Sequence, residues 1–532
     1  MPTENFELVG SYNFQRVIPL DPERSVNLFE YIDPLGKKPK SLLSTSGIVN
    51  SDVVFSTING AFRTQFVFQG VNEATPNMYV VIGFDAFRID PSLIPTLIFS
   101  FTSASNVGYV GIDANTHEVI FVDGNEGWIW DTSTSVATQI TDANFPPAPI
   151  DVTTLDGFFV VANGGTNQFR LSQFNDGLLW TPLQQGTIQS HPGNIVACRT
   201  LHRLLFLFSA NFTEVWENQG IGANLPFRRI NSLLMEVGTP AIGSISTGFG
   251  SLFFLSQDKD GLGSVMQVIG SQPIPISNRA LDFALSQYAE VQQISDARGF
   301  LIKENGLIFY RLNFTAANHT YVYNMTLSDP SREDGKLWHE EEVLNGDRHP
   351  AQTHAYFNGK NYVGSYLEPI MYLIDNVITT NDGEAIRRMR ISRSVVPPGY
   401  QRLRIDRFQL DLLQGQFFPL DGQIVELILF TESIQDILTE LGDQIIAEQF
   451  LTTIANNINP LVYMSISKDG GQTFGYLNAA LMGRIGQRSY RTLWRKLGTI
   501  PRGQGFVIKI EFYEEIPFQI LGSSWSYEIL PE

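Results

Sequence analysis

The sequence of 532 residues contains one cysteine, Cys198, and this scarcity sets the first limit on its structure. A single thiol can form neither an intramolecular disulfide nor a cysteine-based zinc site. The chain also lacks an uninterrupted apolar stretch of about 18 residues, which excludes a membrane-spanning helix. Its first ten residues lack the basic region and apolar run of a secretory signal. We therefore expect a soluble protein that is stabilised by core packing and interfaces and is assembled in the cytoplasm.

Motifs of catalysis and metal binding are missing as well. His339 and the three glutamates after it begin like a zinc-protease helix, but the second histidine is absent. The chain has no G-x-S-x-G nucleophile elbow and no complete phosphate-binding loop. Its 7 histidines are scattered without metal-ligand spacing. These absences predict a protein that is not an enzyme, binds no cofactor and holds no metal.

Basic residues are outnumbered, with 36 Lys and Arg against 54 Asp and Glu, so the formal charge is −18. The part from Arg387 onward contains 15 basic and 15 acidic residues, and the whole acidic excess lies before it. Such a step in charge predicts a domain boundary near residue 385. The acidic balance also argues against a protein that grips phosphate backbones over its whole surface.

The patterns that are present favour β-structure. Between residues 51 and 384, turn residues precede short apolar strands that start near residues 60, 118, 157, 204, 251, 306 and 360. Their spacing averages about 50 residues, which is typical of the multi-stranded repeats of a β-propeller. We predict a mainly β protein with a six- or seven-bladed propeller over 51–384. An unrelated series of hairpins in β-sandwiches is the alternative interpretation.

The C-terminal part has a different pattern. Residues 402–412 alternate between polar and apolar side chains, which predicts a half-buried strand. Residues 432–456 carry apolar side chains at helical spacing and predict a helical insertion. This insertion would pack on its own domain or on a neighbouring subunit. Strand patterns resume from 461 to 530. We therefore predict a β-rich platform domain over 385–532, which the N-terminal segment 1–50 joins.

Residues 467–474 form the sharpest local motif, Ser-Lys-Asp-Gly-Gly-Gln-Thr-Phe. It resembles the Asp-box, S-x-D-x-G-x-T-W, with Phe in place of Trp. Its aspartate can accept hydrogen bonds from backbone N–H groups across a tight turn. Since Asp-boxes occur in sialidases, a glycan-binding or glycan-cleaving propeller, tailspike-like or sialidase-like, is the alternative function. The box is remote from the chemistry there, so a structural role is predicted for Ser467, Asp469, Gly471, Thr473 and Phe474.

Arginines gather in the C-terminal part. Their planar guanidinium groups suit carboxylate or phosphate partners. One interpretation is a surface that contacts a neighbouring subunit or an adaptor protein, and the other is pairing with the equally numerous acids of the same domain. The candidate interface residues are Arg387, Arg388, Arg390, Arg393, Arg402, Arg404, Arg407, Arg484, Arg488, Arg491 and Arg495.

Several segments resemble, in order, one known family. They are 25–30, 36–47, 212–218, 226–230, 254–258, 276–281 and, after the Asp-box, 494–498. The family is that of the packaged-DNA stabilisation proteins of short-tailed phages, also called tail hub or nozzle proteins. The chain departs from the family pattern at Tyr31 and at Ser46, where proline is usual.

This resemblance implies a structural virion protein of a phage tail. It implies a homo-oligomeric ring, a hexamer, below the portal and head-to-tail adaptor proteins. The ring would close and conduct the DNA exit channel, let double-stranded DNA pass transiently, and anchor needle, spike or fibre proteins. It implies no catalysis. We further expect that an acidic wall would repel phosphates at short range and let DNA slide.

Overall fold

The computed structural model describes residues 3–14, 22–33, 39–56, 60–103, 105–220, 225–257, 263–291, 294–396, 399, 401–413, 460–483, 490–502 and 505–530. Contacts between Cα atoms divide the chain into two compact units. The first, which we call the platform unit, consists of Met1–Ile48 and Asp375–Glu532. The second, the propeller unit, consists of Val49–Ile374. The predicted helical insertion 432–456 lies outside the described residues.

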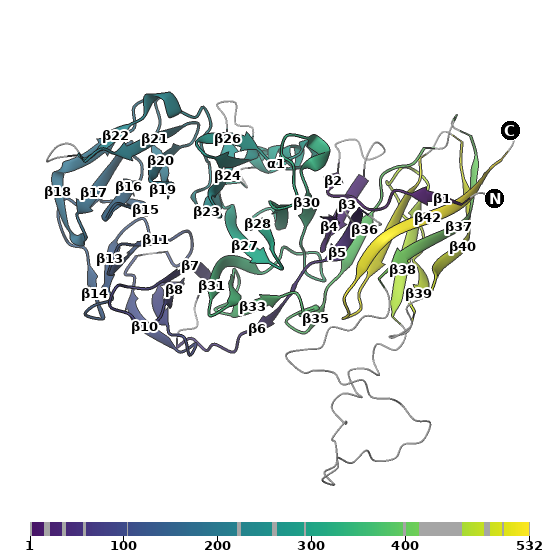
Figure 1. The fold of residues 1–532 in the computed structure, drawn as a ribbon, viewed down its shortest axis with the longest axis horizontal. Helices are drawn as coiled ribbons and strands as arrows, with labels where there is room; N and C mark the ends of the chain where they lie inside the picture. The colour runs from purple at the N-terminus through teal and green to yellow at the C-terminus, as the bar shows by residue number, and fades with distance from the viewer. Residues whose placement is uncertain are drawn as a thin grey trace, which may run out of the picture. The chain divides into compact units, whose positions relative to one another are not determined.

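The described strands of the propeller unit form antiparallel sheets in chain order (Figure 1). The first sheet contains β7 (Phe62–Phe68), β8 (Asn77–Ile82), β9 (Asp85–Ile89) and β10 (Pro95–Ser100). The second contains β11 (Gly111–Ala114), β12 (Glu118–Val122), β13 (Gly127–Asp131) and β14 (Val136–Gln139). The third contains β15 (Pro149–Leu155), β16 (Phe158–Asn163), β17 (Gln168–Gln173) and β18 (Asp176–Thr187).

Four further sheets follow among the described residues. The fourth contains β19 (Ile195–Leu201), β20 (Leu204–Ser209), β21 (Thr213–Asn218) and β22 (Phe227–Arg229). The fifth contains β23 (Ser246–Gly248), β24 (Ser251–Gln257), β25 (Gly263–Ile269) and β26 (Gln272–Pro275). The sixth contains β27 (Arg298–Glu304), β28 (Leu307–Phe314), β29 (His319–Asn324) and β30 (Trp338–Glu340). The seventh contains β31 (Ala351–Phe357), β32 (Lys360–Ser365) and β33 (Met371–Asp375), with β6 (Gly47–Asn50) beside β33.

The first strands of the seven sheets form a closed ring. Each packs against the first strand of the next sheet, from β7 through β11, β15, β19, β23 and β27 to β31, and β31 packs against β7 (Figure 1). Sheets that surround a common axis in this way make a β-propeller. The mainly β fold with a propeller, which the turn-and-strand repeats predict, is therefore confirmed.

The repeated turns have a common conformation. In five sheets the first and second strands are joined by two residues, and both have positive φ. Such hairpins are type I′ turns, in which glycine, asparagine and aspartate are favoured. The joining pairs are 156–157, 202–203, 249–250, 305–306 and 358–359. The sequence repeats thus mark the hairpin that opens each of these sheets.

The second strand of a sheet is buried on both faces. On β12, Val119 and Phe121 pack with Tyr79 of the first sheet, whereas Ile120 packs with Phe159 of the third. Successive side chains of a strand point to opposite faces, so a continuous apolar run supplies both contacts. The same packing is repeated from sheet to sheet around the ring.

Short helices interrupt the strands. The 3-10 helices are η1 (Asn231–Leu233), η2 (Ile242–Ser244) and η3 (Glu333–Gly335). The α-helix α1 (Arg279–Glu290) lies in a region for which the sequence predicts short strands, so the prediction is wrong there. Asn278 accepts a hydrogen bond from Leu281 N as the N-cap, and Leu281 and Leu285 are buried on one side.

The platform unit contains two facing sheets. One contains β1 (Thr3–Phe6), β4 (Leu28–Ile32), β5 (Lys40–Ser44), β37 (Leu403–Leu412), β40 (Thr492–Ile500) and β42 (Gln519–Ile529). The other contains β2 (Asn13–Phe14), β3 (Pro22–Val26), β36 (Arg388–Ile391), β38 (Leu461–Ser467), β39 (Asn478–Leu481) and β41 (Val507–Phe512). The short strands β34 (Thr380–Asn381) and β35 (Glu384–Ala385) form a hairpin.

One hydrophobic core lies between these two sheets. It includes Phe408 and Trp525 from the first sheet and Met464 and Ile510 from the second. Sheets that bury their inner faces against each other in this way make a β-sandwich. On β37 the residues alternate between buried and accessible except at a bulge near Asp406, so the half-buried strand predicted for 402–412 is confirmed.

Replacing Phe121 by alanine tests the packing between sheets. The ring of Phe121 is fully buried, 5.1 Å from the Phe99 ring and 6.3 Å from the Tyr79 ring. We expect Phe121→Ala to lower the free energy of unfolding by about 3–5 kcal/mol in denaturant titrations, because a cavity replaces the ring. Val136→Ala is the control, since Val136 on the outer strand β14 is 53% exposed. Equal losses for the two variants would contradict this packing.

Candidate functional site

The Asp-box residues form a tight turn directly after β38. The Asp469 carboxylate accepts hydrogen bonds from Gln472 N at 3.0 Å, Thr473 N at 2.9 Å and the Thr473 hydroxyl at 2.6 Å. Ser467 Oγ donates to the same carboxylate at 2.6 Å and accepts from Gly471 N at 2.8 Å. Gly471 has a φ of 101°, which other residues rarely adopt.

The aromatic residue of the box anchors this turn to the platform unit. Phe474 packs against Val26, Met389 and Val507, and the Lys509 ammonium lies 5.1 Å from the centre of its ring. Gly475 N donates to Ile466 O at 3.0 Å and so closes the hairpin. The polar groups of the motif that are described above thus form hydrogen bonds within the turn, which is consistent with a structural role.

The candidate interface arginines fall into two groups. Arg388 is fully buried and donates to the carbonyl oxygens of Glu514 at 3.1 Å and Thr379 at 3.2 Å. Burial lowers its pKa to about 10. Its guanidinium lies 5.9 Å from the centre of the Phe512 ring. Arg388 therefore satisfies backbone groups of its own unit.

Arg390 ties the N-terminal segment to β36. Its Nε donates to Leu8 O at 2.7 Å, and its Nη1 donates to Ser11 O at 3.0 Å and Arg24 O at 3.3 Å. Its remaining nitrogen pairs with the Glu23 carboxylate. The guanidinium is 1% exposed, so it is unavailable to another molecule in this conformation.

Other arginines of the set reach the surface. Arg393, Arg402, Arg404, Arg491 and Arg495 are exposed, and Arg387 and Arg407 are half-buried. Arg404 pairs with Glu528, and Arg407 Nη2 donates to Thr3 Oγ1 at 2.8 Å. Arg484 and Arg488 lie outside the described residues.

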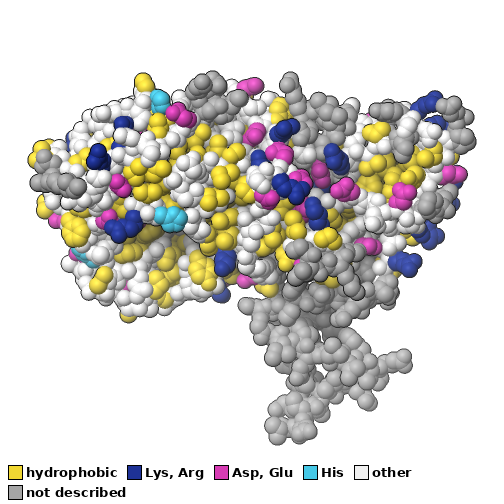
Figure 2. Space-filling model, turned by 45° about the horizontal axis from the view of Figure 1, so that its top comes forward, with side chains coloured by type: hydrophobic (Ala, Val, Ile, Leu, Met, Phe, Trp, Pro, Cys, Tyr) yellow, Lys and Arg dark blue, Asp and Glu magenta, His cyan; other side chains and the backbone are white. Residues whose placement is uncertain are grey.

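Three of these side chains share one surface. Arg404 and Arg407 on β37 and Arg495 on β40 stand opposite the buried residues of their strands, and Arg407 and Arg495 are direct cross-strand neighbours. We call these three residues the Arg face. Like charges directly opposite each other destabilise a sheet, so the pair Arg407 and Arg495 does not stabilise the pairing of β37 with β40. Figure 2 shows one side of the molecular surface. In its described part, basic side chains lie among acidic and hydrophobic ones.

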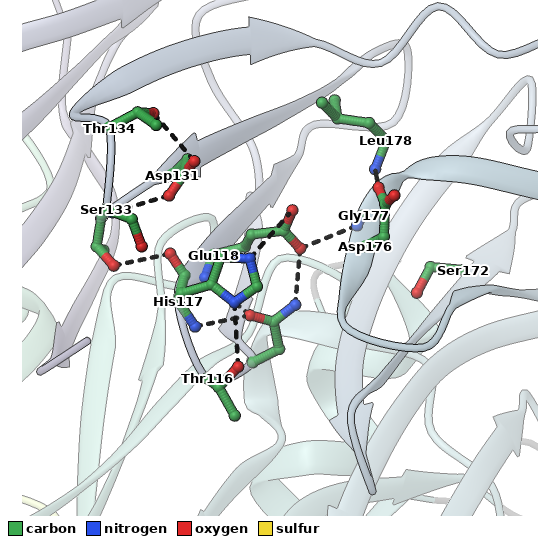
Figure 3. A network of polar contacts seen from close by, with 12 residues as sticks. Thr116, His117, Glu118, Asp131, Ser133, Thr134, Ser172, Asp176, Gly177 and Leu178 are labelled. Carbon is green, nitrogen blue, oxygen red and sulfur yellow. Dashed lines mark hydrogen bonds and ion pairs between the residues drawn. The ribbon is translucent and has the colours of Figure 1, made fainter. Parts of the chain in front are cut away.

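Conspicuous carboxylates of the propeller unit join neighbouring sheets. Glu118 on β12 accepts a hydrogen bond from Gly177 N on β18 at 2.9 Å and from Asn115 Nδ2 at 2.7 Å (Figure 3). His117 Nε2 lies 4.0 Å from the other carboxylate oxygen. Burial raises the pKa of Glu118, although these hydrogen bonds oppose the shift. Glu118 thus links the second and third sheets.

Glu214 has a similar role beside a surface pocket of about 320 Å³. One of its oxygens accepts from Gln189 N at 2.8 Å and Ser190 N at 2.7 Å and pairs with Arg229 at 3.2 Å. The other accepts from Trp216 Nε1 at 2.9 Å. Burial alone would raise the pKa of Glu214, but these hydrogen bonds lower it. All the hydrogen bonds that the Glu214 carboxylate accepts thus come from its own chain. Glu214 and Trp216 belong to segment 212–218 and Arg229 to segment 226–230, so these contacts give the two motif segments a structural role.

Two other kinds of site are absent from the part of the chain that the structure describes. Among the described residues, no group of three or more His, Cys, Asp or Glu side chains is placed to hold a metal ion. No helix in the described part of the chain is long and apolar enough to cross a membrane. Sequence motifs did not indicate the link that Glu118 makes between sheets, because its partner Gly177 is 59 residues away.

The fold and these contacts define a protein with a β-propeller and a β-sandwich whose prominent polar residues hold strands together. The family model described as "Bacteriophage P22 Gp10, beta-propeller" matches residues 22–379. A second, described as "Bacteriophage P22 Gp10, beta-sandwich", matches residues 442–526. The chain therefore belongs to the bacteriophage P22 Gp10 family of packaged-DNA stabilisation proteins, which are structural proteins of the phage virion and its tail.

Other comparisons add little. No curated protein matches the chain at the threshold applied. Similar solved structures include a streptogramin B lyase (10% identity, TM-score 0.38, 62% of this chain and 97% of that one). They also include virginiamycin B lyase from Staphylococcus aureus (10%, 0.40, 59% and 95%) and the WD40 repeats of RRP9 (9%, 0.40, 63% and 99%). Likeness at this level supports no argument about activity.

The Asp-box turn makes a prediction about acid stability. Burial alone would raise the pKa of Asp469, but hydrogen bonds from Ser467, Thr473 and Gln472 lower it from 3.8 to about 2. Because the folded-state pKa is lowered, the stabilisation by ionised Asp469 is complete above the ordinary pKa and is lost as the pH falls through about 2. We expect wild type to unfold at higher urea than Asp469→Asn at pH 6, and the difference to shrink towards pH 2. Asp406→Asn, at an exposed position of β37, is the control.

Arg390 allows a second test within the platform unit. Arg390→Met leaves the Glu23 carboxylate and three carbonyl oxygens without this donor, so we expect a loss of about 3–5 kcal/mol in the free energy of unfolding. Hydrogen exchange should also accelerate in residues 3–14. Arg402→Met, at an exposed position, should change neither quantity. Unchanged exchange in Arg390→Met would contradict the role assigned to this side chain.

Proposed function

We propose that this chain forms a homo-oligomeric ring, the hub or nozzle of a phage tail, below the portal and head-to-tail adaptor proteins. The ring has six copies, closes and conducts the DNA exit channel, and anchors needle, spike or fibre proteins. The observation that carries this proposal is the family match, which extends over both the propeller and the sandwich. The protein acts without catalysis and is assembled in the bacterial cytoplasm before it enters the virion.

The two units divide this work in the proposal. Residues 51–384 serve as the propeller domain, and residues 1–50 with 385–532 serve as the platform. The propeller unit contains 16 Lys and Arg and 30 Asp and Glu, a formal charge of −14. An acidic wall beside the DNA path would keep phosphates from adhering. The platform would contact the adaptor and neighbouring copies through its exposed arginines.

The Arg face is the part of this interface that the structure supports best. Its three guanidinium groups lie on neighbouring strands, and two of them lack a carboxylate among the contacts described above. Acidic side chains of an adjacent propeller unit would complement this charge. Since exposed charges are screened over about 8 Å at physiological salt, such an interface should weaken as ionic strength rises.

The glycan-active alternative has less support. Its motivation was the Asp-box, and that motif is occupied by hydrogen bonds within its own hairpin. The saturated contacts of Glu214 likewise give no free carboxylate for acid catalysis at the pocket beside it.

Oligomeric state tests the proposal. We expect native mass spectrometry and electron microscopy of the purified protein to show a hollow ring of six copies. The double variant Arg404→Glu/Arg495→Glu should shift the protein to monomers at the same concentration, with an unchanged melting temperature of the monomer. Lys360→Glu, at an exposed basic position of the propeller unit, should leave the ring intact. A protein that stays monomeric at all concentrations, or that cleaves a bacterial polysaccharide, would refute the proposal.

A further inference from the structure

Three arginines of the propeller unit meet around the dipeptide Gly108–Tyr109. The Arg199 guanidinium donates to the Tyr109 hydroxyl at 2.6 Å and lies 5.6 Å from the centre of its ring. The Arg298 guanidinium lies 5.2 Å from the centre of the same ring. Arg63 donates to Gly108 O at 3.3 Å, next to the tyrosine in the chain. All three arginines thus contact the dipeptide Gly108–Tyr109.

These side chains come from different sides of the ring. Arg63 lies on β7, Arg199 on β19 and Arg298 on β27, which are the innermost strands of the first, fourth and sixth sheets. Strands on separate sides of a ring can reach one residue only near the common axis. The segment between β10 and β11 therefore carries Tyr109 to the axis. Gly108 is exposed, so solvent reaches this end.

The three cations differ in how their charge is balanced. Arg199 pairs with the buried carboxylate of Asp151. Arg63 is 3% exposed and donates to the carbonyl oxygens of Gly108 and Gly83, which are uncharged. Arg298 rests against the Tyr109 ring. The one direct ion pair described above thus belongs to Arg199, whereas the carboxylates of Asp123 and Asp296 act on Arg63 and Arg298 without a direct ion pair among the described contacts.

The surrounding residues leave room for Arg298 and provide a proton donor. A Cβ atom at Gly243 would lie 2.6 Å from Arg298 Cδ, so glycine at this position of η2 leaves room for the Arg298 side chain. Burial raises the pKa of Tyr109, so its hydroxyl stays protonated and can donate one hydrogen bond while it accepts from Arg199. Asp113, on the innermost strand β11, accepts from Thr154 N at 2.7 Å, and burial raises its pKa to about 6.

Such an arrangement can accept an anion, because Arg63 and Arg298 lack a direct ion pair among the described contacts. Burial and, to a smaller degree, the positive charge of Arg63 lower the pKa of Arg298 to about 10, although Tyr109 and the carboxylate of Asp296 oppose this shift. Buried guanidinium groups are costly without a charged partner, and planar guanidinium groups bind oxyanions through paired hydrogen bonds. A unit with a formal charge of −14 nevertheless keeps these three cations together at its axis.

We propose that Arg63, Arg298 and the Tyr109 hydroxyl form a binding site for a small oxyanion at the axis of the propeller. The ligand class is a phosphate, a sulfate or a compact carboxylate, and Arg199 positions the tyrosine. This inference does not depend on ring formation, since every residue belongs to one propeller unit.

Thermal unfolding in phosphate tests the site. At ionic strength matched with sodium chloride, we expect inorganic phosphate to raise the melting temperature of the wild type with the logarithm of its concentration. Arg298→Met should weaken the apparent affinity at least tenfold. Phosphate also stabilises proteins through exclusion from their surfaces, so the comparison between variants is decisive. Arg332→Met, at an exposed residue paired with Asp334, should respond as the wild type does.

A second variant tests the role of the Tyr109 hydroxyl, and two further ions distinguish the classes of ligand. Tyr109→Phe retains the ring but removes the hydroxyl, so the protein should fold and bind phosphate more weakly in calorimetric titrations. Sulfate binding without succinate binding would identify a tetrahedral anion, and succinate binding would identify a carboxylate. The proposal is overturned if phosphate stabilises wild type and Arg298→Met equally, or if calorimetry detects binding of none of the three ions to the wild type.

Discussion

Closure of the ring of sheets is the constraint on which the propeller unit depends. Each second strand carries apolar side chains on both faces, so each sheet needs a neighbour on both sides. The first and last sheets have no further neighbour along the chain, and they pack on each other, with Met78 and Val80 beside Tyr362 and Met371. No disulfide can replace this closure, because Cys198 is the only cysteine and lies in a core. Noncovalent contacts between the sheets must therefore hold the ring, and close packing is the largest part of them.

Some of the many acidic residues have a structural role in the propeller unit. Glu118, Glu214 and Asp151 are buried, and each accepts hydrogen bonds from a neighbouring strand or turn. Backbone N–H groups at the ends of sheets need acceptors, and a carboxylate can satisfy two or more of them. Part of the acidic excess therefore joins sheets together.

Sequence patterns that are local predicted the fold well. The two-residue turns and the apolar runs after them located the opening hairpins of five sheets. This succeeded because a turn with positive φ and the strand after it depend on the types of adjacent residues. The alternation over 402–412 likewise matched the burial of β37. Helix α1 was missed because it is only 12 residues long and lies among turn-and-strand repeats, and its cap is a single asparagine. The sequence could not distinguish buried arginines from exposed ones, since the buried Arg388 and Arg390 have the same kind of sequence surroundings as the exposed Arg393.

The sequence by itself determined the mainly β class, the repeat, the Asp-box turn and the resemblance to a phage family. These features depend on residues that are close together in the chain, or on motifs that occur along the chain in the same order as in the family. Only the tertiary structure decided which charged groups are buried and which partners they have. Arg63, Arg199 and Arg298 are far apart in sequence and meet because the ring brings their strands to one axis. Ring closure is a long-range property, so no local pattern could reveal this cluster.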